Sequence, residues 1–299
     1  RRGIAYAYGD KYMKKTLRMG DLLELDAPSV QHRLKVIIDS KNLVLENVYN
    51  QEPLSYDEIM EWCRSQAEFF KDYICDVGTL LGAAAGQGKN ILFEAQLGAL
   101  RDIDYGIYPF TSSSNTIASY APIGAGIPGC ALDNVVGVMK AYSTCVGEGP
   151  FVAETAMGEA WNEKLRESGG EFGAATGRPR RVGPFDAVAS RYGIRCQKAQ
   201  DIALTKLDVL GAFDKIPVIT GYRLHGVLLD SFPTDSRLEE AEPVIEELPG
   251  WECDISGCRS WKDLPENARK YVCTLEKLVD HPIYLVSTGA ERDAYLLRE

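Results

Sequence analysis

Residues 171–208 read EFGAATGRPRRVGPFDAVASRYGIRCQKAQDIALTKLD, and this stretch decides the fold class. It opens with a loop of small residues at 173–177, which arginines follow at once. Glycines let backbone N–H groups turn toward a ligand, and guanidinium groups match carboxylate or phosphate oxygens. The stretch ends with Lys206 and Asp208, directly after the apolar run 201–204. A carboxylate there can accept from the two adjacent N–H donors of a guanine ring, so the stretch indicates a nucleotide site.

Strand and helix patterns alternate around this stretch. Apolar runs predict strands, and helical spacing of apolar residues predicts helices. The expected strands are 91–94, 201–204, 217–222 and 282–286, and the expected helices are 131–142, 185–197, 239–247 and 264–279. This alternation predicts an α/β fold with a mostly parallel central sheet flanked by helices, and ligands at the carboxyl ends of the strands. Ser287, Thr288 and Gly289 also follow an apolar run, so they belong to the same predicted edge.

The composition excludes several classes of protein. Of the 299 residues, 45% are hydrophobic and 25% are charged, as in a soluble globular protein. The formal net charge of −10 argues against general binding to nucleic acid or to an anionic membrane. No apolar run reaches the ~20 residues of a membrane span. Eight scattered cysteines favour reduced thiols and a cytoplasmic protein.

Two glycine-rich segments imitate nucleotide-binding loops. In 82–90, five residues separate Gly82 from Gly88, and Asn90 replaces the Ser or Thr that would hold Mg²⁺, so we interpret the segment as a helix end and a turn. The segment 124–129 matches G-x-G-x-x-G, but Pro128 and the lack of a preceding strand argue against a dinucleotide site.

The domain organisation follows from the absence of repeats and linkers. We expect one continuous domain over residues 1–299, with a helical segment at about 55–82 inserted and the nucleotide part at 171–299. Either Ser55 or Asp57 can cap the first inserted helix. The polar segment 102–116 could serve a metal or a sugar phosphate, but its spacing favours a surface loop with Asx and Ser turns.

Several motifs occur in one order along nearly the whole chain. They are Asp102-Ile-Asp104-x-Gly106-x-Tyr108-Pro109, Thr111 to Thr116, Lys140-Ala-Tyr-Ser-Thr-x-Val146-Gly147-x-Gly149-Pro150-Phe151, Glu171-Phe-Gly-Ala-x-Thr-Gly-Arg-x-Arg-Arg, Leu204-Thr-Lys-Leu-Asp-Val-Leu and Ser287-Thr288-Gly289. Together they make the chain resemble the adenylosuccinate synthetases.

That family is a branch of α/β proteins with a P-loop-NTPase-like architecture. It joins IMP and L-aspartate, using GTP and Mg²⁺: GTP phosphorylates the IMP 6-oxygen, and the aspartate amine then displaces the phosphate. The resemblance also implies a cytoplasmic homodimer in AMP biosynthesis.

The resemblance implies a role for particular residues. GTP would be bound by Arg180, Lys206, Leu207, Asp208, Ser287, Thr288 and Gly289. The loop that closes on aspartate would be Ala174, Ala175, Thr176, Gly177, Arg178, Pro179 and Arg180. IMP would be bound by Lys14, Gln96, Leu97, Ser112 and Arg178.

The sequence departs from the family pattern at several places. Lys14 stands where the family reaches across a dimer interface with an arginine, and Ser112 where it usually has threonine. The IMP-contacting glutamine aligns with Leu97, unless Gln96 takes that role. The family's N-terminal Gly-Asp-Glu-Gly-Lys-Gly-Lys loop and following histidine have no counterpart here, so we expect a fragment without catalytic or metal-binding residues and without activity on its own. The alternatives are a non-catalytic truncated paralogue, which binds a guanine nucleotide or a partner subunit, and a generic GTP-binding module.

Overall fold

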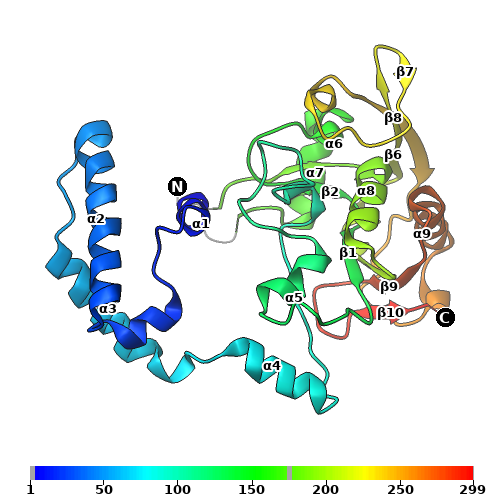
Figure 1. The fold of residues 1–299 in the computed structure, drawn as a ribbon. Helices are drawn as coiled ribbons and strands as arrows, with labels where there is room; N and C mark the ends of the chain where they lie inside the picture. Colours follow the sequence, from blue (N-terminus) through cyan, green and yellow to red (C-terminus); the bar gives the residue numbers. More distant parts are fainter. Residues whose placement is uncertain (1–3, 174–176, 299) are drawn as a thin grey trace. The chain divides into compact units, whose positions relative to one another are not determined.

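A computed structural model describes residues 4–173 and 177–298 of the chain (Figure 1). These residues form two compact units. The first comprises residues 1–93 and 122–129, and the second comprises 94–121 and 130–299. The single continuous domain expected from the sequence stays a prediction.

The first unit is helical. Its helices are α1 (Ala5–Tyr12), α2 (Pro28–Tyr49), α3 (Tyr56–Phe70), α4 (Val77–Gly86) and most of the short α5 (Ala121–Gly124), with 3₁₀ turns η1 (Met19–Glu24) and η2 (Lys71–Tyr73). Proline at the first position starts α2, where its missing N–H costs nothing. A small core joins the buried faces of α2 and α3 and consists of Leu25, Val30, Leu34, Ile38, Met60 and Cys63.

The structure confirms the sequence interpretation of this helical region. The Ser55 hydroxyl caps α3 by accepting from the backbone N–H of Glu58, and the helices α3 and α4 cover most of the predicted segment 55–82. Helix α4 ends at Gly86, so the glycine-rich segment 82–90 is a helix end and a turn, as the sequence predicted. None of the helices in the described part of the chain is long and apolar enough to span a membrane.

The main sheet of the second unit has the order β1-β5-β9-β10. Its strands are β1 (Val136–Lys140), β5 (Asp201–Thr205), β9 (Ile283–Ser287) and β10 (Tyr295–Leu297). The first three run parallel, and only β10 is antiparallel. Helices α8 (Ala187–Gln197) and α9 (Glu266–Val279) precede β5 and β9, as crossover helices do. The predicted α/β fold with a mostly parallel sheet and flanking helices is therefore confirmed.

Smaller sheets complete the second unit. One contains β4 (Phe185–Asp186), β6 (Lys215–Leu224), β7 (Val227–Leu228) and β8 (Glu242–Pro249), and another pairs β2 (Ser143–Cys145) with β3 (Arg181–Gly183). The remaining elements are α6 (Val152–Thr155), α7 (Glu159–Gly169) and the 3₁₀ turns η3 (Ala99–Arg101), η4 (Ala118–Tyr120), η5 (Asp208–Ala212), η6 (Ser236–Glu239) and η7 (Trp261–Asp263).

Three sequence predictions of secondary structure were wrong. The segment 131–142 is not a helix but contains β1, whose valines alternate with Gly137 and pair with β5. The segment 239–247 is not a helix either, because β8 pairs with β6 along eight residues and this pairing outweighs the helix propensity of its glutamates. Residues 91–94 are irregular and form no strand in the described structure.

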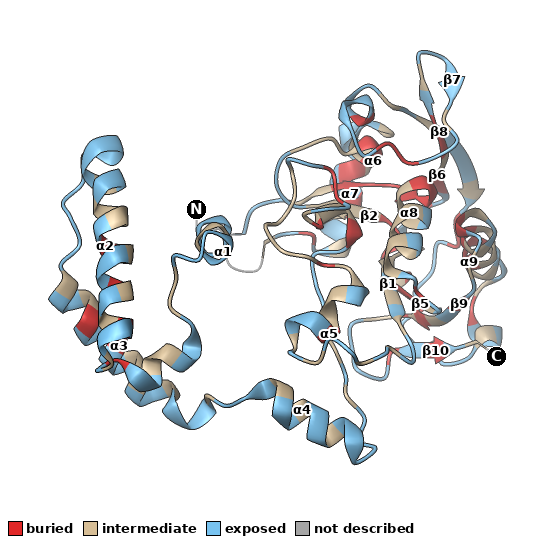
Figure 2. Cartoon of the chain, viewed as in Figure 1, coloured by how far each residue is buried: buried red, intermediate tan, exposed pale blue. Residues whose placement is uncertain are grey.

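The main core of the second unit contains residues of both larger sheets and of α9. Figure 2 shows buried residues along β6, β9 and the inner face of α9. The buried side of α9 is formed by Ala268, Tyr271, Val272, Leu275 and Val279, at helical spacing. The Tyr271 hydroxyl donates to the carbonyl of Ala141, 2.6 Å away, so the helix is also held to the chain that leaves β1.

Close packing at Gly183 of β3 gives a stability prediction. A Cβ added there would lie 2.1 Å from the carbonyl oxygen of Ala153, whereas one at Gly257 would meet nothing within 4 Å. We expect Gly183→Ala to lower the free energy of unfolding by about 1–3 kcal/mol. Gly257→Ala is the matched control and should stay within about 0.5 kcal/mol of wild type in a urea titration. Equal stability of the two variants would contradict this packing.

Candidate functional site

The carboxyl ends of β5 and β9 bring two predicted site segments to one edge of the main sheet. The two strands are parallel neighbours, and Leu204 of β5 is the partner of Val286 of β9. Lys206–Asp208 and Ser287–Gly289 therefore leave the sheet side by side. This edge is where parallel α/β sheets hold their ligands.

Lys206 adopts a backbone conformation that non-glycine residues seldom use, with φ of +60°. Its ammonium nitrogen donates to the carbonyl of Gly169, 2.6 Å away, at the carboxyl end of α7. It also lies 3.1 Å from Glu171 Oε1. The negative pole of a helix and a carboxylate thus fix the direction of this lysine.

Asp208 begins the 3₁₀ turn η5 and is half-buried. Burial raises the pKa of its carboxyl group, and the attraction of Lys206 opposes this rise. Leu207, between them, is fully buried and anchors the segment in the core. The segment therefore presents one carboxylate whose solvation is already reduced, which strengthens its hydrogen bonds to a bound donor.

The segment after β9 is held by its own hydrogen bonds. The Ser287 hydroxyl donates to the carbonyl of Gly289 at 2.9 Å. Thr288 is fully buried, and its hydroxyl donates to the carbonyl of Cys258 at 3.2 Å. A Cβ on Gly289 would lie 3.1 Å from the Cβ of Ala294, so the backbone there runs close to its neighbour.

A buried carboxylate, Glu171, organises the surroundings of Lys206. Glu171 is fully buried, and its side chain accepts from Lys140 at 2.9 Å, Tyr142 at 2.6 Å, Lys206 at 3.1 Å and Arg180 at 2.8 Å. We call these five residues the Glu171 cluster. In the sequence, Glu171 stands out only as the start of a motif. A carboxylate next to a loop rich in arginines is the signal that could have indicated its role.

The electrostatics of the Glu171 cluster follow from one carboxylate among three cations. Burial alone would raise the pKa of Glu171, but the hydrogen bonds from Tyr142 and Lys140 and the cationic charges outweigh it and lower the pKa to about 2. Burial lowers the pKa of Lys140, and repulsion from Lys206 adds to this. Burial and the hydrogen bond to Glu171 raise the pKa of Tyr142.

The predicted aspartate loop is closed at its base by a short stem. The backbone N–H of Arg180 donates to the carbonyl of Glu171 at 2.9 Å, and Phe172 and Pro179 form an antiparallel bridge. The N–H of Gly173 donates to the carbonyl of Arg178 at 2.8 Å. Gly177, Arg178 and Pro179 are exposed, and Gly177 has φ of +64°. Ala174, Ala175 and Thr176 lie outside the described residues.

Besides Arg178, the residues assigned to IMP belong to three other segments of the chain. Lys14 is exposed in the first unit, with φ of +61°. Gln96 and Leu97 are exposed in the second unit, and the Leu97 backbone is left-handed with φ of +74°. The Ser112 hydroxyl lies 2.7 Å from that of Ser114.

The segment 102–116 has the Asx turn that was favoured for it. The carboxylate of Asp102 accepts from the backbone N–H groups of Asp104, Tyr105 and Thr116. Asp102 is fully buried, so the segment is not simply a surface loop. The three N–H groups satisfy the hydrogen-bonding capacity of both carboxylate oxygens. Asp102 therefore shapes the loop that carries Ser112.

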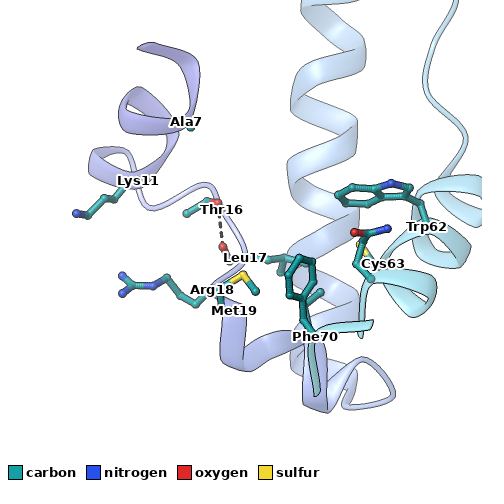
Figure 3. A pocket seen from close by; sticks show the side chains of 11 residues that line it. Ala7, Lys11, Thr16, Leu17, Arg18, Met19, Trp62, Cys63 and Phe70 are labelled. Carbon is teal, nitrogen blue, oxygen red and sulfur yellow. Dashed lines mark hydrogen bonds between the residues drawn. The ribbon is translucent and has the colours of Figure 1, made fainter. Parts of the chain in front are cut away.

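A cavity of about 480 Å³ lies within the first unit (Figure 3). Its walls are formed by Ala7, Lys11, Thr16, Leu17, Arg18, Met19, Leu22, Trp62, Cys63, Gln66 and Phe70. Figure 3 shows Trp62, Cys63 and Phe70 on one side of the cavity, with Lys11 and Arg18 on the other. None of the residues that the sequence assigned to IMP, aspartate or GTP belongs to this wall.

A mostly parallel sheet with polar and charged side chains after adjacent strands is typical of α/β enzymes that bind their ligands at this edge. Residues 1–296 match the family model "Adenylosuccinate synthetase". The chain belongs to the adenylosuccinate synthetase family, whose members are GTP-dependent ligases.

Individual relatives agree with this family. The adenylosuccinate synthetase of Trichlorobacter lovleyi is 46% identical over 297 residues, which are 99% of this chain and 68% of that protein. The one from Pelobacter propionicus is 44% identical over 297 residues, with the same coverage. The structure resembles that of the fully ligated adenylosuccinate synthetase from Plasmodium falciparum, with a TM-score of 0.89 and 32% identity over 98% of this chain and 68% of that one.

The Glu171 cluster gives a prediction for stability and its pH dependence. Glu171→Gln keeps the size of the side chain but leaves Lys140, Arg180 and Lys206 without their carboxylate. We expect it to lower the free energy of unfolding at pH 7 by about 3 kcal/mol. The folded pKa of about 2 lies below the usual 4.5. The stabilisation is therefore complete above the usual value, and it is lost as the pH falls toward about 2.

Urea titrations at several pH values test this expectation. The difference between wild type and Glu171→Gln should shrink as the pH falls below the usual glutamate pKa. Glu159→Gln is the matched control, because the Glu159 side chain is 76% exposed and its ion pair with Arg166 is 3.4 Å long. It should change stability by no more than about 0.5 kcal/mol. If the difference in the free energy of unfolding between wild type and Glu171→Gln stayed constant with pH, the charge of Glu171 would not stabilise the fold.

Proposed function

We propose that this chain performs the part of adenylosuccinate synthesis that binds guanine nucleotide and aspartate. The complete reaction joins IMP and L-aspartate, consumes GTP and releases GDP and phosphate in AMP biosynthesis. The observation that carries the proposal is the placement of Lys206–Asp208 and Ser287–Gly289 at the ends of adjacent parallel strands. Membership of the family supports it.

In this proposal the Asp208 carboxylate recognises the guanine ring through hydrogen bonds. Its two oxygens accept from the ring N–H and the exocyclic amino group, which adenine does not offer in that arrangement. The Lys206 stem lies along the base while its ammonium stays on Gly169 and Glu171. Backbone groups of Ser287, Thr288 and Gly289 complete the base pocket, and Leu207 holds the segment in place. Arg180 contacts the nucleotide from the neighbouring loop.

The same proposal gives the other residues their partners. The loop of Ala174, Ala175, Thr176, Gly177, Arg178, Pro179 and Arg180 closes on aspartate. Arg178 also faces IMP, and Ser112 binds the IMP phosphate from the loop that Asp102 shapes. Gln96 takes the IMP contact rather than Leu97, because an amide can hydrogen-bond to the nucleotide and a leucine cannot. Lys14 acts across the interface of a homodimer.

Magnesium and cellular location complete the proposal. When bound with GTP, Mg²⁺ would supply positive charge that neutralises the charge on the phosphates. Within the described ranges, no group of three His, Cys, Asp or Glu residues lies where it could hold a metal ion. These residues do not fit a magnesium site by themselves, so we assign them no metal-dependent step. The eight described cysteines are all unpaired, which supports a cytoplasmic location.

Asp208→Asn tests the base reading. An asparagine keeps one acceptor but turns a donor toward the guanine amino group, so the affinity for GDP should fall about tenfold or more. Xanthosine diphosphate, with a carbonyl at that position, should bind the variant better than it binds wild type. Asp214→Asn, at an exposed position, should leave both affinities unchanged. Calorimetric titrations of the three proteins measure this, and an unchanged GDP affinity in Asp208→Asn would refute the assignment.

Formation of adenylosuccinate tests the whole reaction. IMP, aspartate, GTP and Mg²⁺ are supplied to this chain alone, and to this chain joined to the part of the Trichlorobacter lovleyi enzyme that the match leaves uncovered. We expect product from the joined protein, detected by its ultraviolet absorbance. GDP binding without product in either protein would favour the non-catalytic paralogue. No GDP binding and no product would refute the proposed function.

A further inference from the structure

Lys140 lies at the same edge of the main sheet as the two segments proposed to bind guanine. It ends β1, which is the neighbour of β5 on the side opposite to β9. In the parallel ladder Lys140 is the partner of Thr205, the residue directly before Lys206. Along this edge, the end of β5 therefore has the segment after β9 on one side and Lys140 on the other.

The Lys140 ammonium is held in place but keeps a donor for a ligand. It donates to Glu171 Oε1 at 2.9 Å and to the Thr144 hydroxyl at 3.0 Å. An ammonium group has three donors, so one N–H has no hydrogen-bond partner among the described residues. The side chain is 28% exposed, which leaves this donor open to solvent or to a ligand.

The charge around Lys140 favours an anion. Glu171 Oε1 also accepts from Lys206 at 3.1 Å, so the two ammonium groups are neighbours, and Arg180 donates to the other oxygen of that carboxylate. Three partly exposed cations thus share one fully buried carboxylate. The Nε atom of Arg180 is also buried, without a hydrogen-bond partner in the described structure. A phosphate beside the Glu171 cluster would add the negative charge that the cluster lacks and would accept from its open donors.

We propose that Lys140 is a further binding residue of the nucleotide site, whose ammonium donates to a phosphate group of the guanine nucleotide that Asp208 recognises. This inference rests on the proposed function, because it takes the edge after β5 and β9 as the guanine site. The ribose and phosphates then extend from the end of β5 toward β1. Glu171 and Thr144 already orient the ammonium, so little side-chain entropy is lost when the phosphate binds.

Calorimetric titrations of this chain with guanosine and with GDP test the contact, because the two ligands share the base and differ in the phosphates. In Lys140→Gln the amide can still bond to Glu171 and Thr144, but the positive charge is lost. We expect the affinity for GDP to fall about tenfold or more, and the affinity for guanosine to stay within about twofold of wild type. Lys140→Arg keeps the charge and should retain most of the affinity for GDP.

Lys215→Gln is the matched control for the loss of one lysine charge. The Lys215 side chain is 67% exposed and belongs to β6, in a different sheet. This variant should bind both ligands as wild type does.

The outcomes separate this inference from the proposed function. A loss of affinity in Lys140→Gln that is confined to GDP supports the phosphate contact. Equal losses for guanosine and GDP would show that Lys140 only supports the fold of the site, and unchanged affinities would show that it touches no phosphate. Either result overturns the inference and leaves the base recognition by Asp208 intact. Absence of binding of both ligands to wild type overturns the inference and the proposed function together.

A second measurement needs no variant, in case Lys140→Gln does not fold. Wild type is acetylated with and without each ligand, and mass spectrometry measures the modification of Lys140. Protection by GDP but not by guanosine supports the contact. Equal modification in the presence of the two ligands overturns it.

Discussion

The arrangement of the candidate site depends on the balance between one buried carboxylate and three cations. Without Glu171, the ammonium groups of Lys140 and Lys206 and the guanidinium of Arg180 would repel one another in a partly desolvated space. With it, the three come together from separate segments: the end of β1, the turn after β5 and the loop after α7. The carboxylate thus sets where Lys206 lies relative to Arg180, at the base of the loop after α7.

Sheet topology brings the other half of the site together. The parallel pairing of β5 with β9 places Lys206–Asp208 and Ser287–Gly289 at one edge of the sheet. Leu204 and Val286, which precede these segments, belong to the hydrophobic core. Leu207 is buried in that core, so Lys206 and Asp208 on either side of it turn to the edge of the sheet. The left-handed backbone conformation of Lys206 raises the free energy of the folded state, and the burial of Leu207 offsets this conformational strain.

The sequence predicted the mostly parallel sheet and the positions of Lys206–Asp208 and Ser287–Gly289 at its strand ends, because short apolar runs followed by polar residues mark buried strands. It failed at β1 and β8, where the deciding interaction is a long-range ladder that no local window contains. It also missed the role of Glu171. The partners of that residue lie 9 to 35 positions away in the chain, and only the fold shows that they converge.

A second buried carboxylate, Asp186, differs from Glu171 in its partners and in the direction of its pKa shift. Asp186 caps α8, accepting from the N–H groups of Val188 and Ala189, and the hydroxyl of Tyr222 donates to it as well. These hydrogen bonds rival those of Glu171 in number, yet burial raises the pKa of Asp186 to about 6, whereas the pKa of Glu171 falls to about 2. At Glu171 the hydrogen bonds from Tyr142 and Lys140, together with the cationic charges, outweigh the effect of burial on the pKa, whereas the hydrogen bonds to Asp186 do not. Asp186 therefore serves as a structural cap, whereas Glu171 keeps a full charge under the proposed site. A carboxylate that stays charged can hold the cations of Lys206 and Arg180 in one position through its two oxygens.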